Sequence, residues 1–140
     1  MTTKGSGFSL IELLVVVAII GILAAVGTLS YQGYISSTKR NSTENMMQQI
    51  SLSQTEVYSE SGMYFTQEEN CRPDRELTQN LGEVFFNNEE AIDKKNGWVM
   101  CITPTGDTGY TIRASNCIGC EPEDEIKITL DNNGIWGTTY

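Results

Sequence analysis

Four cysteines are the side chains of this sequence whose type and spacing are best suited to chemistry. Cys117 and Cys120 form a C-x-x-C pair, whereas Cys71 and Cys101 stand alone farther upstream. Thiols in such positions form disulfides, bind zinc or exchange electrons. A redox C-x-x-C opens a helix, but Glu121 and a proline follow Cys120 directly, and a four-cysteine zinc site would normally use two close pairs. We therefore expect disulfides, and keep a thiol or metal-binding module as the alternative.

The pairing of the cysteines is not set by their spacing, because four cysteines allow three connectivities. In a chain exported from the cytosol an even number of cysteines favours disulfides, and each bridge would stabilise a small domain by roughly 2–4 kcal/mol. We favour a Cys71–Cys101 bridge that ties an irregular connection to the first strand. Cys117–Cys120 would then close a tight local loop.

The composition excludes several classes of function. The 140 residues hold no histidine, which rules out imidazole metal sites and His-based catalytic triads. Eighteen acidic and nine basic residues give a net charge of −9, which disfavours a general nucleic-acid binder. There is no nucleophile motif or Gly-rich phosphate loop, so we expect neither an enzyme nor a cofactor. The acidic run Glu121–Glu125 offers oxygens of the kind that calcium prefers, although a solvated loop is the simpler interpretation.

An apolar run from Phe8 to Leu29 dominates the start of the chain. As a helix it would be about 33 Å long, enough to cross a bilayer. The segment Ser36–Tyr140 that follows carries 17 acidic and eight basic residues, and therefore the whole net charge of −9. A cleaved secretory signal ending near Gly27 is an alternative, but its positive region would consist of Lys4 and the start amine alone.

Glu12 interrupts this apolar run near its beginning and needs a partner. Placing a carboxylate in the membrane costs roughly 2.5–3.5 kcal/mol. Its favourable interaction with the helix dipole offsets only about 0.3–1 kcal/mol of this cost. A cut between Gly7 and Phe8 would create an α-amine about one helical turn before Glu12. The α-amine of a neighbouring molecule could equally supply the positive charge that pairs with Glu12. The sequence therefore predicts processing after Gly7 and suggests assembly.

The stretch Gly7–Leu13 (GFSLIEL), after a short hydrophilic leader, resembles the N-terminus of type IV prepilins. Leu13–Ala25 and Tyr31–Ile35 continue like the helix of that family. The resemblance implies cleavage after Gly7 by a prepilin peptidase, N-methylation of Phe8, and polymerisation by bundling of these helices.

One position departs from the family pattern. Leu29 stands where the family commonly has a helix-breaking proline. The sequence leaves open whether Gly21–Leu29 unwinds on assembly, because only its two glycines weaken the helix, each by about 1 kcal/mol.

The function that this resemblance implies is that of a structural subunit of a bacterial type IV pilus. The chain would be a single-pass inner-membrane precursor that then joins an extracellular filament serving adhesion or twitching motility. Its partners would be other pilins in a homo- or heteropolymer, the prepilin peptidase and the inner-membrane assembly machinery. A type II secretion pseudopilin is the alternative within the same class. The absence of a cysteine-bounded loop after the last predicted hairpin tilts the expectation towards a minor pilin, although the sequence leaves major and minor open.

The predicted fold is α+β, a type IV pilin fold in which one long helix packs on an antiparallel sheet of three to four strands. We expect a leader over residues 1–7, a hydrophobic helix half over 8–35 and a soluble head over 36–140. Within the head, an amphipathic helix half spans 36–61, a connecting region 62–97 and the sheet 98–140.

The expected helix runs from Phe8 to Ser61, with Gly62 as its stop. Its sheet-facing stripe has members at three- and four-residue steps: Met46 or Met47, Ile50, Gln54 and Val57. A short helix is expected in the connecting region over Glu76–Phe86. The expected strands are Trp98–Thr103, Gly109–Ser115, Glu125–Asp131 and Ile135–Thr138. Pro104–Asp107 and Asn132–Gly134 are the predicted hairpin turns.

Overall fold

The computed structural model describes residues 7–92, 96–117 and 127–139. Contacts divide the chain into two units, Met1–Thr38 and Lys39–Tyr140. We describe each unit by itself and refer to the second, within its described residues, as the head.

Helix α1 spans Leu10–Ser61 and takes part in both units. It begins two residues later than predicted, because Ser9 lies outside the helix and accepts its first backbone hydrogen bond, from Leu13. The helix ends as predicted at Gly62, which adopts a left-handed φ of 74°. Glycine is favoured there because it has no Cβ to clash in that conformation.

The stretch around Gly27, which the sequence leaves as a weak point, is continuous helix here. The Thr28 hydroxyl donates to the Ala25 carbonyl, and the Ser30 hydroxyl donates to the Val26 carbonyl. Such side-chain bonds to the preceding turn compete mildly with the helix ladder. The two glycines of Gly21–Leu29 therefore do not interrupt α1 in this structure, and its unwinding on assembly stays untested.

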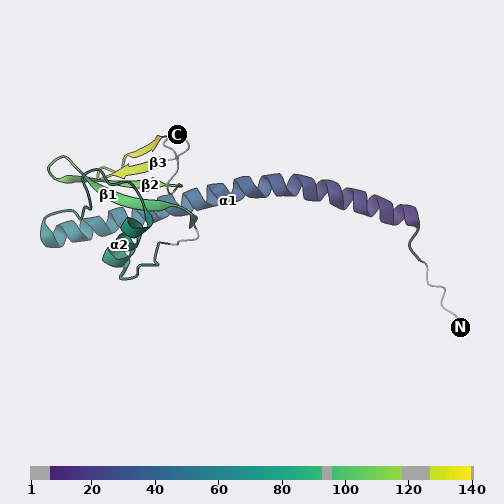
Figure 1. The fold of residues 1–140 in the computed structure, drawn as a ribbon, viewed down its shortest axis with the longest axis horizontal. Helices are drawn as coiled ribbons and strands as arrows, with labels where there is room; N and C mark the ends of the chain where they lie inside the picture. The colour runs from purple at the N-terminus through teal and green to yellow at the C-terminus, as the bar shows by residue number, and fades with distance from the viewer. Residues whose placement is uncertain (1–6, 93–95, 118–126, 140) are drawn as a thin grey trace. The chain divides into compact units, whose positions relative to one another are not determined.

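The head contains a four-stranded antiparallel sheet in the order β1-β2-β3-β4 (Figure 1). Its strands are, in chain order, β1 (Val99–Thr105), β2 (Gly109–Ser115), β3 (Lys127–Asp131) and β4 (Trp136–Thr139). Consecutive strands pair throughout, so the topology is a simple meander. The α+β prediction, with a long helix on a small antiparallel sheet, is confirmed.

The first hairpin corrects one detail of the sequence-based prediction. Pro104 and Thr105 were expected in the turn but belong to β1, where they pair with Tyr110 and Gly109. The turn is therefore residues 106–108. A proline is tolerated here because β1 is an edge strand, and the missing N–H need not cost a ladder hydrogen bond.

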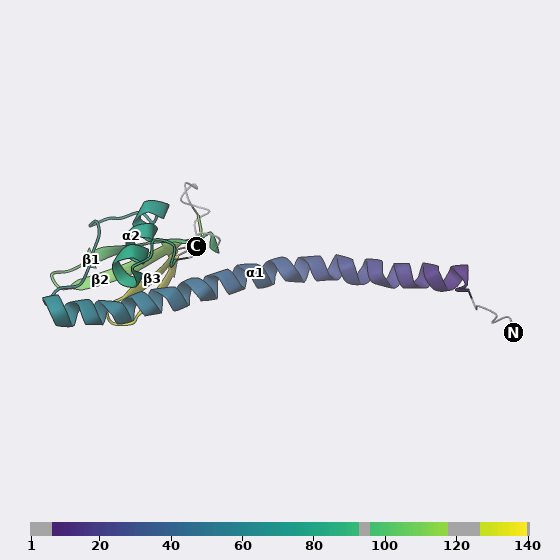
Figure 2. The same ribbon diagram turned by 90° about the horizontal axis from the view of Figure 1, so that it is seen from below.

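The core of the head lies between one face of α1 and the sheet (Figure 2). Met47, Ile50 and Gln54 are fully buried as predicted, whereas Met46 and Val57 are only partly buried. They share the interior with apolar residues of the strands: Met100, Ile102, Ile112, Ile128 and Leu130. The alternation expected in β3 is confirmed for Ile128 and Leu130, while residues 125 and 126 lie outside the described chain.

Helix α2 spans Arg75–Phe86 and packs beside β1. The Asp74 side chain caps its start by accepting a hydrogen bond of 2.8 Å from the Leu77 N–H. The Thr78 hydroxyl accepts from the Met100 N–H across 2.8 Å, which attaches the helix to the strand. The short helix predicted over Glu76–Phe86 is confirmed, one residue longer at its start.

Candidate assembly site at the start of the N-terminal helix

The site begins with a short non-helical segment over residues 7–9, directly before α1. Ser9 is the N-cap, since its carbonyl accepts the first helical bond from Leu13 at 3.3 Å. The Ser9 N–H donates to a carboxylate oxygen of Glu12 across 3.2 Å. The peptide bond between Gly7 and Phe8 thus lies outside the helix, with both residues exposed.

The partner of Glu12 in the uncut chain is one that the sequence analysis missed. We expected a cation and considered the helix dipole, whereas the structure supplies a specific backbone donor. The spacing Ser9-x-x-Glu12 is that of a capping box, in which the acidic residue at the third helical position accepts from the N-cap N–H. This pattern was present in the sequence and would have predicted both the bond and the start of α1.

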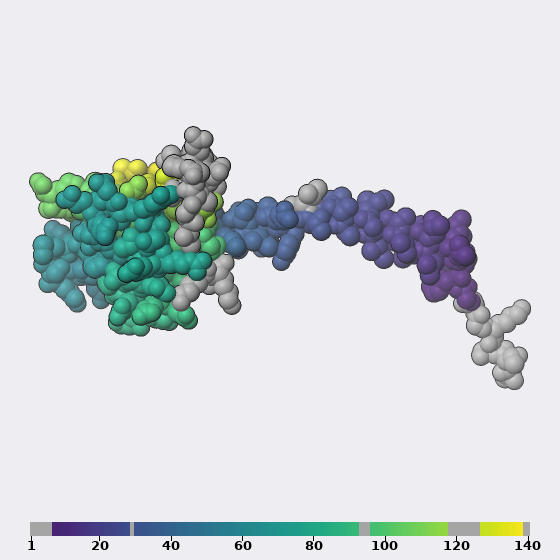
Figure 3. All heavy atoms as spheres, viewed as in Figure 1, coloured from purple at the N-terminus to yellow at the C-terminus, as the bar shows by residue number. Residues whose placement is uncertain are grey.

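The helix that follows exposes apolar side chains in every direction. Along residues 10–26 none of the Leu, Ile and Val side chains is buried, and the most exposed, Leu10, reaches 85% (Figure 3). The helix is long and apolar enough to cross a membrane. A helix that is apolar all round is stable only in lipid or packed among other helices. This segment therefore needs an apolar environment that the described chain does not provide.

The disulfide predicted between Cys71 and Cys101 is present, with both residues buried. It joins the connection before α2 to β1, as expected. Cys117 is also disulfide-bonded, but Cys120 lies outside the described residues, so the second predicted pair stays a prediction.

The comparisons with known proteins agree with these observations. The model of the prokaryotic N-terminal methylation motif matches residues 3–28, which include the capped start of α1. A type IV major fimbrial protein, FimA, of Dichelobacter nodosus is 34% identical over 137 residues, covering 95% of this chain and 76% of that protein. The chain belongs to the type IV pilin family. It is therefore a structural pilus subunit, made as an inner-membrane precursor and incorporated into an extracellular pilus.

Other type IV pilins and fimbrial proteins are also similar in sequence to this chain. A fimbrial protein of Pseudomonas aeruginosa is 28% identical over 141 residues, covering 93% of this pilin and 82% of that protein. The type IV major pilin PilE of Neisseria gonorrhoeae is 38% identical over 64 residues, which cover 46% of this pilin and 38% of PilE. No solved structure gave a significant match. These relatives include major pilins, and the expectation of a minor pilin stays a prediction.

The thiol or metal-binding alternative has little to support it in this pilin. Cys71 and Cys101 are bonded to each other and are therefore not free to bind a metal. Within residues 7–92, 96–117 and 127–139 no group of three His, Cys, Asp or Glu side chains could hold a metal ion. The acidic run Glu121–Glu125 that we considered for calcium lies outside the described residues.

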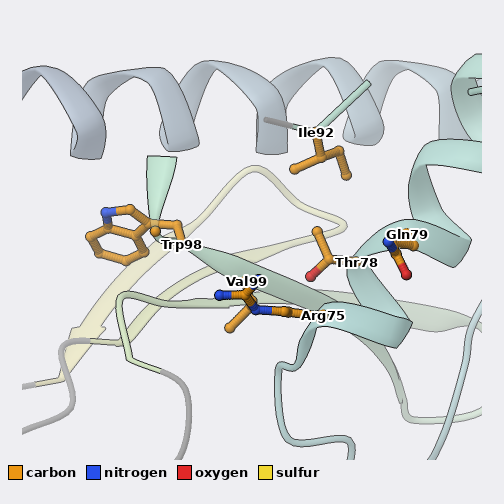
Figure 4. Close-up of a pocket in the computed structure, with 7 residues that line it drawn as sticks. Arg75, Thr78, Gln79, Ile92, Trp98 and Val99 are labelled. Carbon is orange, nitrogen blue, oxygen red and sulfur yellow. The ribbon is translucent and has the colours of Figure 1, made fainter. Parts of the chain in front are cut away.

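The head has a small apolar cavity between α2 and the start of β1. Thr78 and Gln79 on α2, Ile92, and Trp98 with Val99 on the strand side line a space of about 20 Å³ (Figure 4). A volume of this size holds about one water molecule. The space is therefore too small for a ligand larger than about one water molecule.

Tyr110 is a titratable residue of the head whose surroundings raise its pKa. Its ring is buried, and its hydroxyl shares a hydrogen bond of 2.9 Å with the hydroxyl of Ser51. Burial raises the pKa of Tyr110 above its ordinary value, because the phenolate would lose its hydration. The hydrogen bond shared with Ser51 lowers this pKa in part, and the nearby Tyr64 and Asp131 raise it. The hydroxyl links β2 to α1 through Ser51, which fits a structural role.

Proposed function

We propose that this pilin is cut between Gly7 and Phe8 by a prepilin peptidase, methylated on the new Phe8 amine, and assembled through the apolar half of α1. In this scheme residues 1–7 are the leader, 8–35 form the hydrophobic helix half and 36–140 form the head. The observation that carries the proposal is the position of Glu12, a carboxylate in the first turn of a helix with exposed apolar side chains on every face.

The uncut chain supports cleavage at this bond. A peptidase needs an extended, accessible backbone, and residues 7–9 are non-helical and exposed, with Phe8 at 84%. The N-cap at Ser9 keeps the helix from extending back over the bond to be cut. Cleavage there would leave Phe8 as the first residue, four positions before Glu12.

Charge balance supports assembly after the cut. Within residues 7–92, 96–117 and 127–139 the Ser9 N–H is the hydrogen-bond donor to Glu12, and this bond partly satisfies the carboxylate without placing a cation beside it. The α-amine of Phe8 would be a cation, and in a bundle of parallel helices the amine of a staggered neighbour can approach Glu12. Pairing in an apolar medium is strong because the dielectric constant is low.

The partners that follow are other pilins, as a homo- or heteropolymer, together with the peptidase and the inner-membrane assembly machinery. The role is structural, and we propose no catalytic activity. Every relative described above is a fimbrial or pilin protein.

The test combines mass spectrometry with a pair of Glu12 variants. The mature protein recovered from cells should begin at Phe8 and carry one methyl group on its amine. Glu12→Gln should be cut normally and yield at least tenfold fewer surface filaments, because it removes the charge at nearly constant size. Glu12→Asp, which keeps the charge, is the matched control and should retain more filament than Glu12→Gln.

Three results would contradict the proposal. The native chain could still carry its first seven residues, it could be cut beyond Gly27, or Glu12→Gln could assemble as well as the wild type. A chain that is cut correctly but found in no stable extracellular fibre would instead indicate a secretion pseudopilin.

A further inference from the structure

The head has a second hollow, larger than the space that Ile92 lines. The last turn of α1, the segment that follows it and the turn between β1 and β2 lie at the same end of the head (Figures 1 and 2). Together they line a groove of about 190 Å³, against about 20 Å³ for the space beside Ile92. We call it the end groove. Besides three glycines, its lining includes: Tyr58, Met63, Tyr64, Pro104, Asp107 and Thr108.

The aromatic side of the end groove is held in place by the fold. The rings of Tyr58 and Tyr64 stack with their centroids 4.5 Å apart. Tyr64 also meets the buried ring of Tyr110 edge-on, with the centroids 4.8 Å apart. The next residue, Phe65, is fixed because both its backbone groups bond to the side chain of Gln54. The rings are therefore positioned before a ligand arrives, which lowers the entropic cost of binding.

The charge of the end groove is negative. Among the described residues, Asp107 is the charged side chain that lines it, and no Lys, Arg, Asn, Gln or Trp side chain does. Within the same described ranges the exposed Asp107 carboxylate forms no hydrogen bond or ion pair. The side-chain donors of the lining are hydroxyl groups, which accept as readily as they donate. The groove thus offers acceptors and a carboxylate, on a chain whose net charge is −9. This arrangement attracts a cation and repels an anion.

We propose that the end groove binds a quaternary ammonium group, such as the trimethylammonium of choline. A cation is attracted both to the face of a tyrosine ring and to a carboxylate. Tyr58 is 42% exposed and so leaves aromatic surface open to a ligand. Methyl groups on the cation find apolar contacts at Met63 and Pro104.

A primary ammonium fits the end groove less well. It carries three N–H donors, each of which needs an acceptor, whereas a quaternary nitrogen has none to satisfy. The inference goes beyond the proposed function and does not depend on cleavage or assembly, because every lining residue lies in the head.

The first experiment compares choline with its carbon analogue, a neutral alcohol of the same shape in which a carbon atom replaces the nitrogen. Binding to the full chain is measured by NMR titration in an uncharged detergent without a choline group. Choline should bind about tenfold more tightly than the neutral alcohol. Equal binding would overturn the proposal, since the groove would then recognise only an apolar shape. Tighter binding of methyl glucoside than of choline would also overturn it and would indicate a sugar site.

The second experiment removes the carboxylate. Asp107→Asn should weaken choline binding about fivefold. Glu83→Gln, at an exposed position of α2, changes the net charge of the chain equally and should stay within about twofold of the wild type. Both variants should unfold at the wild-type denaturant concentration, because both side chains are exposed. Equal effects of the two variants, or no effect of Asp107→Asn, would overturn the assignment of the site.

The third experiment removes the ring. Tyr58→Leu keeps an apolar side chain but loses the aromatic face, and should weaken choline binding about fivefold. Tyr58→Phe keeps the face and should bind within about twofold of the wild type. If the leucine and phenylalanine variants bind choline equally well, the ring does not hold the cation and the proposal fails.

A last titration identifies the source of the ligand. Glycerophosphocholine carries the headgroup of a choline lipid. If it binds as tightly as choline, the end groove accepts headgroups on a membrane surface. If choline alone binds, the ligand is a free amine, because the adjacent phosphate is repelled by Asp107. Binding of neither would overturn the proposal. Choline binding by a chain that is never cut at Phe8 would leave this inference standing while the proposed function fails.

Discussion

The backbone N–H of Ser9 donates a hydrogen bond to the carboxylate of Glu12 across 3.2 Å, one turn apart at the start of α1. The bond gives the acidic side chain a partner before any cleavage takes place. It also sets the first residue of the helix, so that the peptide bond between Gly7 and Phe8 stays outside it. Glu12 thus caps the start of α1 in the uncut chain, and after the proposed cut it would lie four residues from the new Phe8 amine.

Removing the buried disulfide should destabilise the head. Replacing Cys71 and Cys101 together by alanine should lower the free energy of unfolding by about 2–4 kcal/mol, because their bridge constrains a loop with a sequence separation of 30. Denaturant titration of the detergent-solubilised chain, followed by tryptophan fluorescence, measures this, since Trp98 and Trp136 both lie in the head. Wild-type chain measured in reductant should be destabilised at least as much as the variant, because the reductant also breaks the disulfide of Cys117. An unchanged midpoint would show that the bridge contributes nothing.

Gln54 should be essential for the path of the chain after α1. Its fully buried amide donates to the Phe65 carbonyl at 2.6 Å and accepts from the Phe65 N–H at 2.9 Å. Gln54→Leu keeps the volume but leaves both backbone groups unpaired, which should cost about 2–4 kcal/mol in the same titration. Gln49→Leu, on the exposed side, should change stability by less than about 0.5 kcal/mol. Similar effects of the two variants would contradict this role.

Gly82 should resist a substitution that helix propensity favours. A Cβ at this position of α2 would lie 2.6 Å from the carbonyl oxygen of Asn88 and 3.2 Å from that of Glu89. Gly82→Ala should therefore destabilise the head by about 1–3 kcal/mol, although alanine alone would stabilise a helix by about 1 kcal/mol. Glu83→Ala, exposed on the same helix, is the control and should be near neutral. Stabilisation by Gly82→Ala would show that the loop after α2 moves aside.

Tyr110 should make the head less stable at high pH. Because burial raises its pKa, the folded chain keeps the phenol proton at pH values where the unfolded chain has released it. The stabilisation is complete below pH about 10 and is lost as the pH rises through the folded pKa. Unfolding free energies measured across this range should fall less steeply for Tyr110→Phe than for the wild type. Equal slopes for Tyr110→Phe and the wild type would refute the assignment.

The elements of the head follow from local patterns in the sequence. The sheet-facing stripe of α1 was predictable because Ile50 and Gln54 fall at helical spacing, and the final hairpin because Asn133-Gly134 suits a tight turn. The capping relation of Ser9 and Glu12 was equally local and was missed only because Glu12 was considered as a charge. The expected turn at Pro104 failed because edge strands tolerate proline, and edge position is a property of the assembled sheet.

The sequence by itself determined the apolar helix, the lone carboxylate near its start and the α+β class, because each depends on the order of residues along one segment. Only the tertiary structure decided that Cys71 pairs with Cys101, since four cysteines allow three connectivities and proximity arises from folding. It also decided how deeply each member of the predicted sheet-facing stripe is buried, since Ile50 and Gln54 are fully buried whereas Val57 is only partly buried. A helical pattern specifies which residues share a face, but the partner of each face depends on what the rest of the chain covers.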